Sequence, residues 1–350
     1  MRFKVMCITM LFVAVLALTG CNRSANVINV FNWGDYLDES ILAEFTAHTG
    51  IAVNYTTFAS NEEMYTRIIA GGVGFDLLFP SDYMIERMIR EERLLPINFD
   101  NIPNFRYIDE KFLDLPFDPG NRYSVPYKWG TLGILYNTVM VAEIAGDIVV
   151  DSWDIMWDER FSGSIFMYDS MRDAFAVALK RLGFSINSTN LDEIHAARDM
   201  LILQRPLVRA YVGDHVKDFM VNREAALALV YSGDAMFTMS LNPELNYVVP
   251  REGSNIWFDN MVIPYGAPNQ EGAEAFINFL NYPEIALRNT LYTGYSTTNR
   301  AAFDLLPEDI RNNPVYWPPD EVYNRSEPFI HLGEFIAVYE RAWTEVLASR

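Results

Sequence analysis

The first 80 residues alternate short apolar segments with amphipathic ones, and this alternation restricts the fold more than any other feature of the chain. We predict strands at Val27–Phe31, Ile51–Phe58 and Phe75–Pro80, which are short and rich in apolar, β-branched or aromatic residues. Helices are predicted between them, from Ser40 to His48 and from Asn61 to Gly71. A β-α-β-α-β order implies parallel strands joined by right-handed crossovers, which is typical of an α/β domain.

The predicted helix ends agree with this order. Gly50 stands where helices commonly end on glycine. Ser60 and Glu63 form an S-x-x-E capping box at the start of the second helix. Because open α/β sheets bind ligands beyond the carboxyl ends of their strands, the loops Asn32–Tyr36 and Ser81–Tyr83 are candidate site segments. Each loop contains an aromatic residue, a small residue and a carboxylate.

The remainder of the chain continues the α/β pattern. Arg122–Asn137 is a long extended segment that contains Pro126 and Gly130, as expected of a crossover between domains. Further strands are predicted at Ser164–Met167, Tyr247–Pro250 and Ile256–Pro264. Further helices are predicted at Met171–Leu182, Arg223–Val230, Gln270–Asn281 and Gly333–Ala348. Two more helices are predicted to begin at Ser152 and after Asn190.

The N-terminus indicates an exported chain. Arg2 and Lys4 precede an apolar run from Val5 to Leu18, which is too short to span a bilayer comfortably and suits a signal peptide over residues 1–20. Leu18-Thr19-Gly20-Cys21 resembles the lipobox of bacterial lipoproteins, so Cys21 would carry the lipid and residues 21–26 would form a tether. An ordinary secretory signal with a stray cysteine, or a buried helix, is the alternative.

Cysteine content and charge bound the function further. Cys7 and Cys21 are the only cysteines, so the mature chain would hold no disulfide, and the lipid would be its sole link to the membrane. Removing Arg2 and Lys4 with the signal moves the net charge from -19 to about -21. Such a surface repels nucleic acid and attracts cations, although solubility alone also explains it.

Length favours two domains, since residues 21–350 exceed one typical hydrophobic core. No flexible linker separates the two α/β halves, so the chain must cross between lobes more than once. We predict two lobes, each a mixed β-sheet flanked by helices, around a cleft that closes by hinge motion. The first lobe would contain residues 27–131 and 257–302, and the second residues 132–256 and 303–350.

Several catalytic and cofactor motifs are absent. The sequence has no GxxxxGK[ST] loop, no GxGxxG after a strand and no GxSxG elbow. The four histidines, His48, His195, His215 and His331, share no metal-ligand spacing. We therefore predict no cofactor, no metal and no catalytic residues. A carboxylate pair for glycoside hydrolysis stays open, because acidic residues are plentiful.

Carboxylates stand beside aromatic residues at several places along the chain. This combination suits a slender ligand with ammonium groups and an apolar chain, since carboxylates pair the ammonium ends and aromatic faces cover the methylenes. Asp259 is notable because it interrupts a predicted strand. Packing of the aromatic residues and helix capping by the aspartates are the alternative explanations. The residues concerned are Trp33 with Asp35, Ser81 with Tyr83, Tyr231 with Asp234, Trp257 with Asp259, and Tyr295.

Seven sequence segments resemble the bacterial periplasmic spermidine/putrescine-binding proteins, in order from residue 27 to the C-terminus. The segments are Asn32–Tyr36, Ser60–Glu62, Phe75–Ser81, Phe117–Pro119, Tyr123–Gly130, Ile256–Asn260 and Thr293–Asn299. The resemblance implies a type II-like periplasmic binding protein fold and no catalysis. It also implies an aromatic box of Trp33, Tyr36, Tyr83, Trp257 and Tyr295 beside Gly34, with Ser81, Asp173 and Asp259 binding amines.

The chain also departs from this family's pattern. Spermidine-preferring relatives carry aspartate where Ser170 stands, tryptophan where Tyr231 stands, and glutamine where Phe329 stands. Asp35 and Asp234 instead match putrescine-preferring relatives. The resemblance therefore implies polyamine binding without ranking putrescine against spermidine.

We accordingly expect the substrate-binding component of a polyamine ABC importer, a monomer that delivers its ligand to a permease and its ATPase. A binding protein of the same fold for a different small cation or metabolite is one alternative. A surface lipoprotein with a sensing or adhesion role is another.

Overall fold

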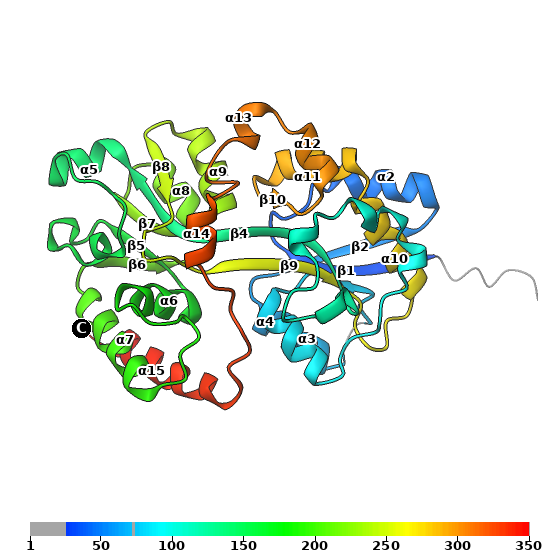
Figure 1. Ribbon diagram of the computed structural model, residues 1–350, viewed down its shortest axis with the longest axis horizontal. Coiled ribbons are helices and arrows are strands. Elements are labelled where there is room, and N and C mark those ends of the chain that lie inside the picture. Colours follow the sequence, from blue (N-terminus) through cyan, green and yellow to red (C-terminus); the bar gives the residue numbers. More distant parts are fainter. Residues whose placement is uncertain (1–25, 72–73, 350) are drawn as a thin grey trace, which may run out of the picture.

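The computed structural model describes residues 26–71 and 74–349, and Figure 1 shows them arranged as two lobes joined by long strands. The predicted signal peptide, the predicted lipidation site Cys21 and the rest of the predicted tether up to residue 25 lie outside the described residues. Among the residues that are described, no helix has the length and apolar character needed to cross a membrane.

The first lobe contains the predicted β-α-β-α-β order. Strand β1 (Val27–Trp33) pairs in parallel with β2 (Ala52–Phe58) on one side and β3 (Leu77–Leu78) on the other. Helices α2 (Ser40–Thr49) and α3 (Asn61–Ile69) connect them. The parallel arrangement predicted from sequence is therefore confirmed, although β3 is shorter than expected.

The helix-end signals also act as predicted. Gly50 ends α2 with a left-handed φ of 74°. The Ser60 hydroxyl accepts a hydrogen bond from the Glu63 backbone N–H at 3.1 Å. The Glu63 carboxylate accepts from the backbone N–H of Ala59 at 2.9 Å, one residue before the serine. Side chains thus satisfy backbone donors at and before the start of α3.

Strand β4 (Ser124–Asn137) belongs to both lobes. Its first half pairs antiparallel with β9 (Ile256–Val262). Its second half pairs antiparallel with β7 (Leu227–Tyr231) and β8 (Leu245–Val248). The continuous strand order is β2-β1-β3-β9-β4-β7-β5-β6, so one hydrogen-bonded ladder runs through the junction of the lobes (Figure 1).

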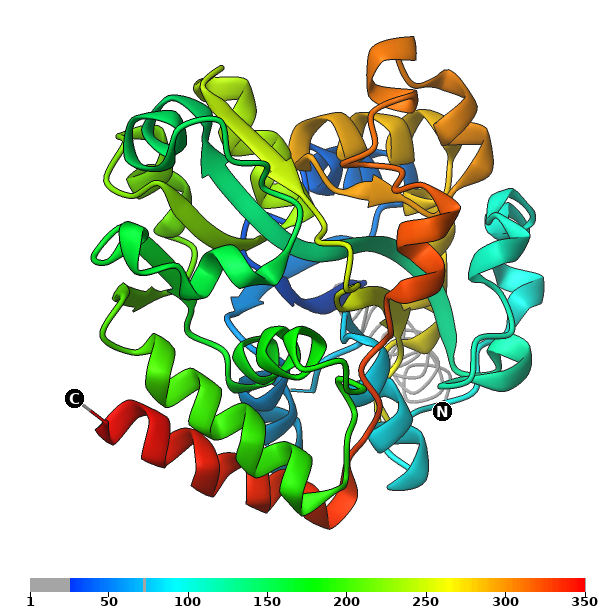
Figure 2. The same cartoon turned by 60° about the vertical axis from the view of Figure 1, so that its left-hand side comes forward.

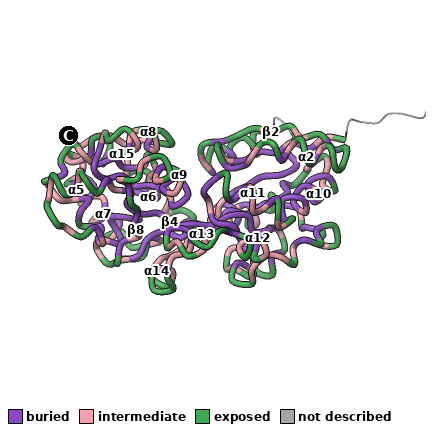
Figure 3. The backbone as a smooth tube through the Cα atoms, turned by 90° about the horizontal axis from the view of Figure 1, so that it is seen from above, coloured by how far each residue is buried: buried purple, intermediate pink, exposed green. Residues whose placement is uncertain are grey.

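The second lobe is built on β5 (Ile165–Tyr168), which pairs in parallel with β6 (Val208–Val212) and β7. Helices α6 (Met171–Arg181) and α7 (Leu191–Gln204) pack on each other, and the C-terminal helix α15 (Ile336–Ala348) lies along α7 (Figure 2). Buried backbone runs through each lobe and along the connecting strands (Figure 3).

The remaining elements complete the two lobes. The other helices are α4 (Asp82–Arg90), α5 (Thr138–Ala145), α8 (Val216–Val221), α9 (Ser232–Leu241), α10 (Gln270–Leu280), α11 (Pro283–Thr293), α12 (Arg300–Leu305), α13 (Glu308–Arg311) and α14 (Asp320–Arg325). Strand β10 (Ser296–Thr297) pairs with β4. Short 3-10 helices occupy Phe99–Asn101, Pro103–Tyr107, Glu110–Phe112, Pro119–Asn121, Trp153–Trp157, Glu159–Phe161 and Gly333–Phe335.

One predicted element is wrong. The segment Arg223–Val230 was predicted as an alanine-rich helix, whereas residues 227–231 form the buried strand β7 between β4 and β5. A short strand covered on both faces shows no alternation, so periodicity cannot separate it from a helix. Pairing with two neighbours then outweighs the helix propensity of alanine.

The lobe boundaries at 131/132, 256/257 and 302/303 stay predictions. The pairing of β4 changes from β9 to β7 between Thr131 and Leu132. Helix α12 packs on α11 and β10 of the first lobe. Beyond α14, an extended segment leads back to α15 in the second lobe (Figure 1).

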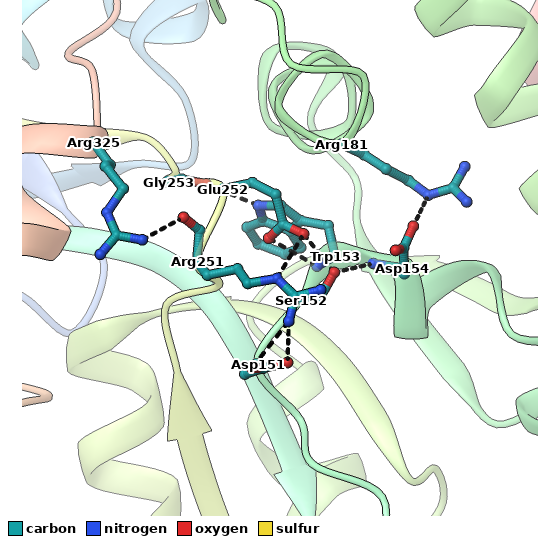
Figure 4. A network of polar contacts seen from close by, with 9 residues as sticks. All are labelled: Asp151, Ser152, Trp153, Asp154, Arg181, Arg251, Glu252, Gly253 and Arg325. Atoms are coloured by element: carbon teal, nitrogen blue, oxygen red, sulfur yellow. Dashed lines mark hydrogen bonds and ion pairs between the residues drawn. The ribbon is translucent and has the colours of Figure 1, made fainter.

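A polar network fixes the turn that leads from β8 into β9, where the chain leaves the second lobe (Figure 4). The Trp153 indole N–H donates to the Gly253 carbonyl at 2.8 Å. The Arg325 guanidinium donates to the Arg251 carbonyl at 2.8 Å. Gly253 itself has a φ of 86°, and a Cβ there would lie 2.1 Å from the Arg325 carbonyl oxygen. Only glycine fits this turn without displacing backbone.

Replacing Gly253 with alanine should therefore destabilise the protein strongly. Gly266→Ala is the matched control, because Gly266 has a φ of 84° but open space where the Cβ would lie. We expect about 1–2 kcal/mol for the control, from backbone conformation alone, and roughly 2 kcal/mol more for Gly253→Ala, from overpacking. Urea unfolding of both variants measures the difference, and equal losses would contradict the proposed clash.

Candidate ligand-binding site

A cavity of about 620 Å³ lies where elements of both lobes meet, and every site residue predicted from sequence lines it. From the first lobe and β9 these are Trp33, Gly34, Asp35, Tyr36, Ser81, Tyr83, Trp257, Asp259 and Tyr295. From the second lobe and the C-terminal segment they are Ser170, Asp173, Tyr231, Asp234 and Phe329. The cavity thus brings together side chains that lie up to nearly 300 positions apart in the sequence.

A row of aromatic rings forms one side of the cavity. The Tyr231 ring lies 6.1 Å from that of Trp257, which lies 5.6 Å from that of Tyr295. The Tyr295 ring is in turn 4.9 Å from that of Tyr36. All three contacts are edge-to-face, which is one of the geometries that pairs of aromatic rings prefer. Trp33, at the end of β1, is anchored by its indole N–H, which donates to the Phe79 carbonyl at 2.8 Å.

Two glycines make room for these rings. A Cβ on Gly130 of β4 would lie 2.5 Å from the Trp257 ring, and one on Gly233 of α9 would lie 2.2 Å from the Tyr295 ring. Both contacts are far shorter than carbon atoms tolerate. These glycines therefore let the rings lie directly against backbone, which fixes the ring positions.

Asp259 lies on β9 at the end of this aromatic row. Its side chain is buried, with the residue 5% exposed. One carboxylate oxygen accepts a hydrogen bond from the Tyr36 hydroxyl at 2.8 Å, and the other oxygen has no partner among the described residues. Burial raises the pKa of the carboxyl to about 6, against the opposing effects of Ser81, Tyr36 and the buried Lys128. The site thus holds a carboxylate with an unfilled acceptor.

Asp173, in the first turn of α6, repeats this pattern. The residue is 2% exposed. Its Oδ2 accepts from the Tyr231 hydroxyl at 2.6 Å, while Oδ1 has no partner. Burial raises the pKa of this carboxyl. Ser170 is the N-cap of the same helix, and its hydroxyl faces the Asp173 backbone N–H at 3.5 Å.

Asp234 and Asp35 differ from these two carboxylates because each forms an ion pair with a lysine. The Lys217 ammonium lies 3.6 Å from Asp234 Oδ1 and 3.4 Å from Asp35 Oδ2. Asp234 is buried in the first turn of α9, and burial raises the pKa of its carboxyl. Asp35 follows β1 at the rim, with its side chain 84% exposed.

The far wall combines a cation with aromatic rings. The guanidinium of the buried Arg172 lies 4.2 Å from the centre of the Phe329 ring. It also donates to the Asn187 side chain at 3.0 Å. The Tyr83 ring stands perpendicular to that of Phe329 at 6.2 Å, and the Tyr83 hydroxyl donates to Glu62 at 3.0 Å. Tyr83 and Phe329 thus meet across the two lobes.

Sequence reasoning missed several residues of the cavity wall, namely Glu62, Tyr168, Arg172, Asp214 and Lys217. Asp214 and Lys217 belong to the short helix α8 and its preceding turn, where no motif marks them. Arg172 could have been found from its neighbours, since it precedes Asp173 in the first turn of α6.

The fold and the cavity together define a class of protein, the two-lobe binding protein that holds a small ligand between its lobes. Residues 40–316 match the family of bacterial extracellular solute-binding proteins, and the chain belongs to this family. The family and fold expected from the sequence are thereby confirmed.

Three relatives are similar over nearly the whole chain. A spermidine/putrescine-binding periplasmic protein of Salmonella typhimurium is 33% identical over 337 residues, which is 96% of either chain. The substrate-binding protein of a spermidine/putrescine ABC transporter from Streptococcus pneumoniae is 40% identical, with a TM-score of 0.81 over 92% of this chain and 98% of that one. A lipoprotein of Treponema pallidum is 25% identical, with a TM-score of 0.82 over 91% and 99%.

The buried Asp259 should make the ligand-free protein less stable at high pH. The pKa of its carboxyl is about 6 in the folded state and 3.8 in the unfolded state, so the folded protein binds more protons between these values. The free energy of unfolding therefore falls as the pH rises from about 4 to 6. We expect Asp259→Asn to raise the free energy of unfolding by up to about 3 kcal/mol at pH 8, with the gain disappearing towards pH 4. Urea unfolding across this range measures it. The control is Asp100→Asn, an exposed carboxylate outside the cavity, and a variant no more stable than wild type at pH 8 would refute the assignment.

Proposed function

We propose that this chain captures a linear polyamine, putrescine or spermidine, in the cavity between its lobes and delivers it to an ABC importer. The observation that carries the proposal is the pair of buried aspartates, Asp173 and Asp259, each with one carboxylate oxygen that has no hydrogen-bond partner. A row of aromatic rings connects these two residues through the hydroxyls of Tyr231 and Tyr36.

The chemistry of a polyamine complements this arrangement. A buried acceptor without a donor is unfavourable, and an ammonium group supplies three N–H donors together with the opposite charge. Aromatic faces cover methylene groups and attract cations. A ligand with ammonium groups separated by methylenes would therefore satisfy both aspartates while lying along the rings.

The charge of the cavity favours a cation over an anion. Its described lining contains eight carboxylates and two cationic side chains, those of Arg172 and Lys217. An anion site would instead concentrate arginines and helix N-termini free of acidic residues. Here Asp173 and Asp234 stand in the first turns of α6 and α9. This arrangement disfavours the alternative of an anionic metabolite.

The relatives support the same proposal. Those from Salmonella typhimurium and Streptococcus pneumoniae carry names that specify spermidine and putrescine. We propose that this chain likewise acts without catalysis, as a monomer that hands its ligand to a permease and its ATPase. Attachment through lipid on Cys21 to the extracytoplasmic face of the membrane is proposed from the lipobox, and the Treponema pallidum relative is named a lipoprotein.

Calorimetric titration with putrescine, cadaverine, spermidine and spermine tests the function. We expect saturable binding of at least one amine near micromolar or tighter, about −8 kcal/mol. Asp259→Asn should weaken binding at least tenfold because it removes the charge that pairs with an ammonium, and Trp33→Ala should do so through lost aromatic contact. Asp100→Asn is the control for a distant charge. Absence of saturation with all four amines would end the proposal.

Binding should also weaken as the pH falls. A cationic ligand pairs with the ionised Asp259 carboxylate, whose pKa of about 6 in the empty protein means that protons compete below this value. We expect little change between pH 8 and 7 and a loss of roughly tenfold per unit below pH 6, measured by titration at constant ionic strength. Affinity that stays constant down to pH 5 would show that Asp259 does not pair with the ligand.

A further inference from the structure

Lys217 presents an ammonium group inside the acidic wall of the cavity. It extends from α8, its side chain is 14% exposed, and its Nζ lies within 3.6 Å of Asp234 and 3.4 Å of Asp35. Asp214, one turn earlier, also lines the cavity and accepts a hydrogen bond from Tyr168 at 3.1 Å. The ammonium of the protein's own Lys217 therefore lies among three carboxylates, those of Asp35, Asp214 and Asp234.

The surroundings keep this lysine charged. Burial alone lowers the pKa of the Lys217 ammonium, but the carboxylates of Asp234, Asp214 and Asp35 raise it by more, and the net direction is upward. Lys217 in turn lowers the pKa of Asp234 against the effect of burial. The Lys217 ammonium thus offsets part of the carboxylate charge here before any ligand binds.

Asp173 and Asp259, in contrast, form no ion pair within the described residues, although buried cationic side chains act on their carboxyls from farther away. Asp173 and Asp259 each accept one hydrogen bond from a tyrosine and keep one buried oxygen without a partner. The cavity wall therefore contains carboxylates with an open acceptor and carboxylates that already face an internal ammonium. Only the first kind is ready for an ammonium of the ligand.

The aromatic row leads from one kind of carboxylate to the other. The Tyr295 ring packs beside Tyr36, whose hydroxyl donates to Asp259. The same Tyr295 ring lies directly against Gly233, which precedes Asp234 in the chain. A chain of methylenes that continues past the Tyr295 ring would therefore approach the carboxylates that Lys217 occupies.

We propose that Lys217 is a specificity-determining residue, whose ammonium takes the place of an additional ligand ammonium beside Asp35 and Asp234. The cleft then favours a diamine, which needs only the open carboxylates, over a triamine or tetraamine. A longer amine binds only by displacing Lys217 from its two partners or by placing its last ammonium beside that of Lys217, where the two cations repel each other and share the same carboxylates. This inference rests on the proposed polyamine function.

The test compares Lys217→Met with wild type and with Lys217→Arg. Methionine keeps an unbranched side chain of similar length and removes the charge, while arginine keeps the charge. The measured quantity is the ratio of the dissociation constants for putrescine and spermidine, obtained by calorimetric titration at one salt concentration. We expect Lys217→Met to shift this ratio at least tenfold towards spermidine, with a larger gain for spermine, and Lys217→Arg to leave it within threefold. Lys217→Gln replaces the methionine variant if that variant does not fold.

Each outcome decides between the two proposals. If wild type and Lys217→Met both bind amines with the same ratio, or if both amines gain equally, the role of Lys217 is overturned while the polyamine function stands. If wild type binds no amine but Lys217→Met binds spermidine, the polyamine function of the wild type is wrong, and so is the preference for a diamine that we infer from Lys217. If neither protein binds any amine, both proposals fail.

Discussion

The antiparallel pairing of β4 with β9 is the interaction on which the rest of the structure depends. It joins the parallel strands of the first lobe to the second lobe through one continuous ladder, because β4 goes on to pair with β7 and β8. The same pairing places Trp257 and Asp259 of β9 in the cavity wall. Gly130, opposite Trp257 in this register, leaves the space that the indole fills. The backbone that connects the lobes therefore also builds the site.

The site combines rigid and unsatisfied parts. Aromatic rings packed edge-to-face against glycine backbone hold the wall in place. Against this wall stand Asp173 and Asp259, whose burial without full hydrogen bonding is unfavourable in the empty protein. Binding sites commonly carry such local destabilisation, because the ligand relieves it. Lys217 shows the contrasting solution, in which the protein supplies the missing charge itself.

Sequence predicted the fold and many of the residues that line the cavity for identifiable reasons. Parallel strands end at one edge of a sheet, so Trp33 at the end of β1 and Ser81 after β3 could be expected to meet. Asp259 was conspicuous as a carboxylate within an apolar strand. Lys217 could not be found in this way, because its role arises only when α8 faces the loop after β1, more than 180 residues earlier. The helix predicted at Arg223–Val230 failed because a short strand buried on both faces has no periodicity of its own.

The strand order has a consequence for how the protein is made. In the first sheet β9 lies between β3 and β4, although it follows them in the chain by more than a hundred residues. During synthesis, the N-terminal lobe therefore lacks one of its internal strands until residues 256–262 have left the ribosome. Nascent chains of this topology stay incompletely folded for most of their translation, with native contacts of large sequence separation forming last. Late completion of this kind would keep the chain threadable for a secretion channel, in line with the signal peptide predicted at residues 1–20.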